Sequence, residues 1–335
     1  MKNTLFVLLD GMEDDPNPSL GGKKPYELAK MPFMYSKAKH KMYTTGRGYT
    51  QLFLGEFFTG HTPETPRAAL EAQGLGLDMS NNRTAYRLSP AHLEDGMIRW
   101  SYHAYKFCDE LEKNVRNNLH LVEKYNPEIA FFLNGRAVLT MDCDDVPDLP
   151  GPPVDAPFVE VPGDLGKLVM AVAGSMNGIT DYPWGCGKLG KQYPPFSCIS
   201  NMTAISDSPT ALGVAASLGH KIHLVKEVED RFPVAKEALK EGHVFLHIDE
   251  VDEYSHQKDP QKKIAILEKT DRLMAEYFSD VENVIYFVDH GTSCVTGEHI
   301  LMNVPFWTDI ETDAKDGDLI PLDKVIKMLL GQQEE

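Results

Sequence analysis

The chain has few basic residues for its length. Its 335 residues include 33 Lys and Arg against 50 Asp and Glu, which gives a formal net charge of −17 and a pI near 5.1. Nucleic acids and anionic membrane surfaces are bound through clustered Lys and Arg, and the sequence contains no such cluster. We therefore expect the protein to bind neither nucleic acid nor membrane.

Cysteines and long apolar runs are also scarce. The five cysteines are widely spread and include no Cys-x-x-Cys pair, which argues against a disulfide framework and against a thiolate zinc site. The first apolar run, Leu5–Leu9, stops at Asp10 and is too short for a secretory segment or a membrane span. These features predict a soluble protein of the reducing cytoplasm.

Three apolar runs read as buried strands, and each is followed by polar groups. They are residues 5–9, 244–248 and 284–288, whereas 208–219 and 259–278 have the caps and apolar spacing of helices. Strands that alternate with helices are typical of a three-layer αβα sandwich, in which sites gather at the carboxyl ends of the strands. We predict that fold.

The middle of the chain has a different pattern. Residues 85–88 and 97–100 read as a hairpin across Glu94-Asp95-Gly96, residues 107–125 as a helix, and 146–162 as a proline-rich stretch. This predicts a smaller inserted α+β domain at residues 86–194, with the α/β core formed by residues 1–85 and 195–335.

Carboxylates and imidazoles follow the predicted strands. They are Asp10 after the first strand, Asp252 and His256 after the second, Asp289 and His290 after the third, and His299 beyond them. Such groups bind zinc, manganese and similar ions, and two ions a few ångströms apart stabilise a phosphoryl group during its transfer. Their arrival from separate strand ends favours a metal site over coincidence.

These residues resemble motifs of the alkaline phosphatase superfamily and, within it, of archaeal-type 2,3-bisphosphoglycerate-independent phosphoglycerate mutases. The similarity rests on Val7–Met12, Asp252 with His256, Asp289-His290-Gly291-Thr292, and His299 with Val304-Pro305. The segments 22–29, 70–77, 94–98 and 183–187 also resemble family stretches, so the similarity covers most of the chain.

The resemblance implies two divalent metal ions, Mn or Zn. It places one metal on Asp10, Asp289 and His290, together with a nucleophilic serine. It places the other on Asp252, His256 and His299. It also implies a small anionic metabolite as ligand, with three-carbon phosphoglycerates as the default substrate.

The nucleophile position departs from the family pattern. An ungapped comparison of Gly46–Leu52 with the family's glycine-serine-aspartate segment places Arg47 where the serine belongs, and Gly48 in place of the aspartate. A guanidinium stays protonated and cannot attack phosphorus. A shifted register would instead bring Thr44 or Thr45 to the metals. Asp249 stands where the family has a phosphate-binding lysine.

Three functions remain open from the sequence. The first is phosphoglycerate mutase-like isomerase or phosphotransferase chemistry, which the Arg47 substitution opposes. The second is a hydrolase in which a metal hydroxide attacks a phosphate, phosphonate or sulfate ester, with Arg47 paired to the substrate. The third is a non-catalytic descendant that binds a ligand or partner. Further candidates for anion binding are Lys188, Arg87 and Arg136.

Overall fold

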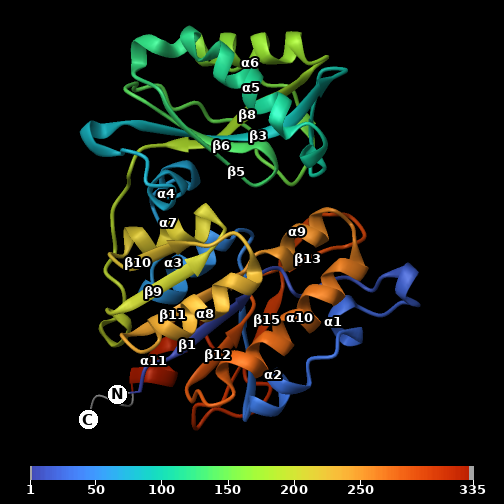
Figure 1. Cartoon of the computed structure of the whole chain (residues 1–335), viewed down its shortest axis with the longest axis vertical. Helices are drawn as coiled ribbons and strands as arrows, with labels where there is room; N and C mark the ends of the chain where they lie inside the picture. The colour runs from blue at the N-terminus through green and yellow to red at the C-terminus, as the bar shows by residue number, and fades with distance from the viewer. Residues whose placement is uncertain (1, 332–335) are drawn as a thin grey trace. The chain divides into compact units, whose positions relative to one another are not determined.

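The computed structural model describes residues 2–331, which form two compact units (Figure 1). Unit 1 contains the residues up to Pro63 and those from Gln192 onward, and unit 2 is Glu64–Lys191. The first boundary was predicted about twenty residues too late. Helix α4 (Arg67–Gly74) packs on the strands of unit 2, so the segment before residue 85 belongs to that unit rather than to the α/β core.

Unit 1 is built on a seven-stranded sheet of order β10-β9-β11-β1-β12-β15-β2. Its first five strands in this order run parallel, while β15 is antiparallel to β12 and β2 is antiparallel to β15. The strands are β1 (Leu5–Leu9), β2 (His40–Thr45), β9 (Met202–Ser206), β10 (Lys221–Leu224), β11 (His243–Ile248), β12 (Val284–Phe287) and β15 (Asn303–Thr308). A separate antiparallel pair consists of β13 (Gly291–Thr292) and β14 (His299–Ile300).

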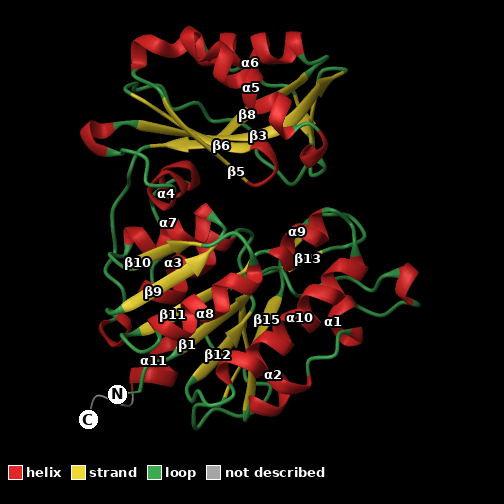
Figure 2. Cartoon of the chain, viewed as in Figure 1, coloured by secondary structure: helices red, strands yellow, loops and turns green. Residues whose placement is uncertain are grey.

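Helices cover both faces of this sheet (Figure 2). On β12, Phe287 stacks on Phe57 of α3, with ring centroids 4.7 Å apart, whereas Tyr286 faces the other way and stacks on Trp307 of β15. The predicted αβα sandwich is confirmed. One group of helices contains α3 (Thr50–Thr59), α7 (Pro209–Ser217) and α11 (Val325–Leu330), and the other contains α1 (Pro25–Leu28), α2 (Pro32–Lys37), α8 (Val228–Ala238), α9 (Glu250–His256) and α10 (Pro260–Phe278).

The strand order explains why the predicted strand ends meet. All five side chains of β1 are fully buried, as expected for a central strand with helices on both faces. Because β11 and β12 pair in parallel with the two edges of β1, the carboxyl ends of these three strands lie together. The polar residues that follow them are thereby brought to one place.

Unit 2 is an antiparallel sheet of order β5-β6-β3-β4-β7, with β8 added on β3. The predicted hairpin has its turn at Asp95-Gly96, but β4 pairs with residues 91–94 of β3, because residues 84–88 pair with β6 and β8 instead. Residues 183–187 are the end of β8. The elements are β3 (Thr84–Glu94), β4 (Met97–Trp100), α5 (Cys108–Asn118), β5 (Glu128–Phe132), β6 (Arg136–Met141), β7 (Ala156–Pro157), α6 (Gly163–Ser175) and β8 (Ile179–Gly187).

Between residues 2 and 331, the structure contains no helix with both the length and the apolar character needed to cross a membrane.

A buried lysine joins three segments of unit 1. Lys263 of α10 is fully buried, and its Nζ donates to the carbonyl oxygens of Gly11 at 2.8 Å and Thr292 at 3.1 Å. It also forms an ion pair with Asp14 Oδ2 at 2.9 Å, and Asp14 Oδ1 accepts from the backbone N–H of Cys294. The ammonium therefore holds the loop after β1 against the loop after β12.

We predict that Lys263→Met destabilises unit 1 by about 3–5 kcal/mol, because the mutation leaves the Asp14 carboxylate buried without its counter-ion. Urea denaturation measured by circular dichroism tests this. Lys262→Met is the matched control, since the Lys262 side chain is 57% exposed and its ion pair with Asp259 is expected to contribute less than about 1 kcal/mol. Equal effects of the two mutations would contradict the prediction.

Candidate metal centre

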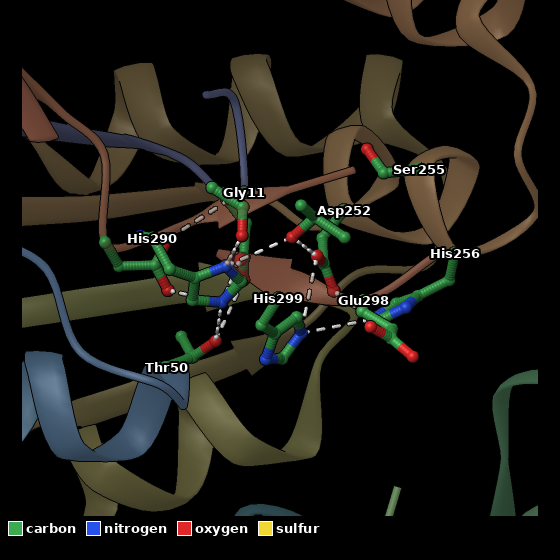
Figure 3. Close-up of polar contacts among 12 residues, drawn as sticks. Gly11, Thr50, Asp252, Ser255, His256, His290, Glu298 and His299 are labelled. Atoms are coloured by element: carbon green, nitrogen blue, oxygen red, sulfur yellow. Dashed lines mark hydrogen bonds and ion pairs between the residues drawn. The ribbon is translucent and has the colours of Figure 1, made fainter. Parts of the chain in front are cut away.

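The six predicted ligands all lie in unit 1 and converge at the carboxyl end of its sheet, and Figure 3 shows four of them, Asp252, His256, His290 and His299. Asp10 follows β1, and Asp289 and His290 follow β12. The remaining three lie on α9, which begins just after β11, and on β14: Asp252, His256 and His299. The parallel order β11-β1-β12 accounts for this convergence.

Asp10, Asp289 and His290 form the first group. His290 Nε2 lies 3.3 Å from Asp10 Oδ1 and 3.3 Å from Asp289 Oδ2. Asp289 Oδ1 accepts the backbone N–H groups of Gly11 and His290, at 3.1 and 3.0 Å. Asp10 Oδ1 and Asp289 Oδ2 are buried and receive no hydrogen bond from the described residues. Buried carboxylate oxygens of this kind are costly unless a cation neutralises them.

Asp252, His256 and His299 form the second group. His256 Nε2 lies 3.1 Å from Asp252 Oδ2, and His299 Nε2 lies 3.8 Å from Asp252 Oδ1. The two groups adjoin, because the rings of His290 and His299 are 4.1 Å apart between centroids. The structure therefore brings together all six residues that the sequence predicted as ligands. Their division into two sets stays a prediction, because donor atoms of Asp252, His290 and His299 also lie within 4.8 Å of one another.

Hydrogen bonds at Nδ1 orient the three imidazoles. His256 Nδ1 donates to Gly297 O and His299 Nδ1 to Gly48 O, both at 2.7 Å. Thr292 Oγ1 donates to Asp252 Oδ1 at 2.5 Å, so it accepts from His290 Nδ1 at 3.1 Å. In neutral rings with these tautomers, every Nε2 presents a lone pair to the centre, as in histidines that bind metals.

Two of these lone pairs face each other. His256 Nε2 and His299 Nε2 are 3.1 Å apart, a distance at which two unprotonated nitrogens repel unless a proton or a cation lies between them. Together with the uncompensated oxygens of the first group, this contact shows that the donor set fits divalent cations bound by imidazole and carboxylate, such as zinc or manganese.

The pKa values of the ligand residues show that the centre lacks positive charge. Burial and the neighbouring Asp289 and Asp252 carboxylates raise the pKa of Asp10 well above its usual range, and burial raises the pKa of Asp289 to about 6. Burial lowers the pKa of His290 to about 4 and that of His299 to about 3. For His256, burial opposes the charged form, but attraction to Asp252 outweighs it and raises the pKa.

Gly11 allows the two groups to approach each other. Its φ of +59° is in the left-handed region, and a Cβ at this position would lie 2.5 Å from Thr292 Oγ1 and 2.6 Å from Asp252 Oδ1. A side chain here would displace the hydroxyl that links Asp252 to His290. The glycine is therefore required by the centre itself.

The side chain of Thr50, and not that of Arg47, lies beside the first ligand group. Thr50 Oγ1 lies 3.3 Å from Asp10 Oδ2 and 3.5 Å from His290 Nε2 at the first residue of α3 (Figure 3). The predicted placement of Arg47 is wrong. Its Nε and Nη2 bond the carboxylate of Glu56 at 2.9 and 2.7 Å, so the guanidinium belongs to an ion pair on α3. Of the two alternatives, Thr45 is an exposed residue at the end of β2, and Thr44 is buried in β2 opposite Val304 of β15.

The hydroxyl of Thr50 reaches the first ligand group because the chain stays extended for several residues beyond β2. The backbone N–H groups of Gly46 and Arg47 bond to Met302 O and Asp289 O, both at 2.9 Å, which holds the chain extended beyond β2. Tyr49 is still extended, at φ −147° and ψ 141°, and the helix begins only at Thr50. The hydroxyl therefore lies three residues beyond Arg47.

The other predicted anion-binding residues lie in unit 2. Lys188 forms an ion pair with Asp144. Arg87 is buried, forms a close ion pair with Glu71 and packs over the Trp184 ring, and burial lowers its pKa to about 10. Arg136 is the half-buried first residue of β6. Their role in substrate binding stays a prediction.

The surroundings of Asp249 disfavour its charged form. Burial, and to a lesser extent repulsion from Asp207, raises the pKa of Asp249 well above its usual range.

Four residues that matter to the centre were not predicted as site residues: Thr50, Thr292, Gly11 and His247. Gly11 and Thr292 flank predicted ligands in the resembling motifs, whereas His247 is hidden within the apolar run of β11.

The comparisons with known proteins agree with this geometry. Residues 198–315, which include five of the six ligand candidates, match a model of the metalloenzyme superfamily. Proteins named 2,3-bisphosphoglycerate-independent phosphoglycerate mutase are similar over most of both chains. That of Thermococcus kodakarensis is 25% identical over 88% of this chain and 85% of its own, and that of Saccharolobus solfataricus is 23% identical over 95% and 87%.

Two solved structures share the fold. The PH0037 protein from Pyrococcus horikoshii superposes with a TM-score of 0.68 at 18% identity, covering 100% of this chain and 98% of that chain. A cofactor-independent phosphoglycerate mutase from Thermoplasma acidophilum gives a TM-score of 0.56 at 16% identity, covering 99% of this chain and 100% of its own. Residues 198–315 thus match the metalloenzyme superfamily, and the chain as a whole is similar in sequence to the 2,3-bisphosphoglycerate-independent phosphoglycerate mutases and shares the fold of such a mutase.

Proposed function

We propose that this protein is a phosphoglycerate mutase-like phosphotransferase that uses two divalent cations, Mn²⁺ or Zn²⁺, and Thr50 as its nucleophile. The observation that carries the proposal is the position of Thr50 Oγ1, 3.3 Å from Asp10 Oδ2 and at the N-terminus of α3. A hydroxyl beside a carboxylate and a cation site is suited to nucleophilic attack, which Arg47 is not.

Each of the two ligand groups would hold one cation. Asp10, Asp289 and His290 would hold one cation beside Thr50, and the second group, Asp252, His256 and His299, would hold the other. The cations would supply the positive charge that neutralises the transferring phosphoryl oxygens.

The transfer itself conserves atoms and protons. Thr50 Oγ forms a bond to phosphorus while the bond between phosphorus and the substrate oxygen breaks. The hydroxyl proton of Thr50 passes to Asp10 Oδ2, the departing substrate oxygen takes up a proton from solvent, and Thr50 becomes a phosphoester. In the reverse transfer the neighbouring substrate hydroxyl returns a proton to solvent, and Asp10 returns its proton to Thr50. Reversal toward the neighbouring substrate hydroxyl completes an isomerisation with no net change.

The names of the relatives support a three-carbon phosphoglycerate as substrate. Arg47 is removed from the proposal because Glu56 holds its guanidinium. Asp249 offers no positive charge where the resemblance expects a lysine. The cations alone would then neutralise the negative charge of the phosphoryl group.

Thr50→Val is predicted to reduce the conversion of 3-phosphoglycerate to the 2-isomer by at least about 10³-fold in the presence of Mn²⁺, because the mutation removes the attacking oxygen. Thr50→Ser keeps a hydroxyl and should retain activity within about tenfold. Enolase-coupled assays of both variants measure this, with metal content determined on the same samples.

Arg47→Ala serves as the control, because it changes the residue that the sequence placed at the nucleophile position. It is expected to keep most of the activity. Full turnover by Thr50→Val would contradict the proposed nucleophile, and release of inorganic phosphate without the 2-isomer would identify a hydrolase. Absence of metal binding and turnover in the wild type would favour the non-catalytic alternative.

Metal binding should weaken as the pH falls. The raised pKa values of His256, Asp10 and Asp289 mean that protons occupy the donor set before the cations do, and the cations must displace them. We expect each Mn²⁺ to release protons and its apparent affinity to fall at least about tenfold between pH 7.5 and pH 5.5. Calorimetry in two buffers of different ionisation enthalpy measures the protons released, and a pH-independent affinity would contradict the assignment.

A further inference from the structure

His247 is a buried histidine beside the centre that belongs to neither ligand group. It lies on β11 opposite Leu8 of β1 in the sheet register, and it is fully buried. A polar ring at this depth in a central strand requires partners, and both of its nitrogens have one.

The two hydrogen bonds of His247 have a defined direction. Its Nδ1 lies 2.8 Å from Ser206 Oγ, and its Nε2 lies 2.8 Å from Asp10 Oδ2. The carboxylate oxygen of Asp10 can only accept, so the proton of the neutral ring lies on Nε2 and Nδ1 accepts from Ser206 Oγ, which itself accepts the backbone N–H of Ser208 at 2.8 Å. The Nε2 proton is donated to Asp10 Oδ2.

This donation determines which oxygen of Asp10 faces the first ligand group. Oδ2 accepts from His247 and, at 3.3 Å, from Thr50, whereas Oδ1 receives no hydrogen bond from the described residues and lies 3.3 Å from His290 Nε2. Asp249 does not compete for the proton, since its Oδ1 is 3.7 Å from His247 Nε2. Without His247 the carboxylate could rotate about its χ2 bond.

We infer that His247 is the positioning residue for Asp10, holding Oδ2 toward Thr50 and Oδ1 toward the cation. The inference rests on the proposed function, because it assigns a role within the same centre. Its chain of hydrogen bonds runs from Ser206 through His247 to Asp10 and Thr50, and it is built entirely from unit 1.

Two substitutions of similar size separate positioning from packing. The amide nitrogen of a glutamine reaches the place of Nε2 and can donate to Asp10, whereas that of an asparagine reaches only the place of Nδ1. We expect wild type and His247→Gln to bind two equivalents of Mn²⁺. His247→Asn should bind one of the two Mn²⁺ equivalents about 10- to 100-fold more weakly than the wild type does. Loss of a residue that orients a metal ligand typically has an effect of this size.

Titration calorimetry with Mn²⁺ alone and elemental analysis of the loaded protein measure these equivalents, and thermal melting of the metal-free variants checks that they fold. Ser206→Ala provides a second variant, which removes the donor to Nδ1 and should weaken the same equivalent less than His247→Asn does. This variant keeps the inference testable if His247→Asn does not fold.

Different results overturn different statements. Equal Mn²⁺ binding by wild type, His247→Gln and His247→Asn would overturn the positioning role while leaving the two-cation centre in place. Three equivalents in the wild type, with one lost in both His247 variants, would make His247 a ligand with Asp10 and Asp249, whose donor atoms lie within 4.8 Å of one another. No binding by the wild type would refute the proposed function itself.

Discussion

The centre depends on a local shortage of positive charge. Asp10 Oδ1 and Asp289 Oδ2 are buried and receive no hydrogen bond from residues 2–331, and the Nε2 atoms of His256 and His299 face each other at 3.1 Å. Each contact is unfavourable by itself in a water-free environment. Together they are the expected state of a donor set whose cations supply the missing charge, and the surrounding architecture maintains this arrangement.

That architecture consists of groups that touch the ligands and do not themselves bind a cation. Thr292 connects Asp252 to His290, and main-chain carbonyls fix the tautomers of the other two imidazoles. Gly11 leaves room for Thr292. The loops that carry these groups follow parallel strands and are joined by the buried Lys263 ammonium. The stability of unit 1 and the geometry of the centre therefore depend on some of the same contacts.

The central strands and the ligands that follow them could be predicted from the sequence, because each ligand lies next to its strand in the chain. The apolar runs of β1, β11 and β12 identify buried parallel strands, and Asp10, Asp289 and His290 follow them directly. Thr50 could not be placed in this way. The length of the segment between β2 and α3 is determined by backbone bonds to Met302 and Asp289, about 240 residues or more away in the chain. The boundary of unit 2 was missed for a similar reason, since α4 joins it only through packing.

The most direct test is anomalous diffraction from crystals grown with Mn²⁺. The account predicts two anomalous peaks, one in contact with Asp10, Asp289 and His290 beside the hydroxyl of Thr50, and the other in contact with Asp252, His256 and His299. Peaks outside these two groups, or none at all under saturating Mn²⁺ near neutral pH, would contradict it.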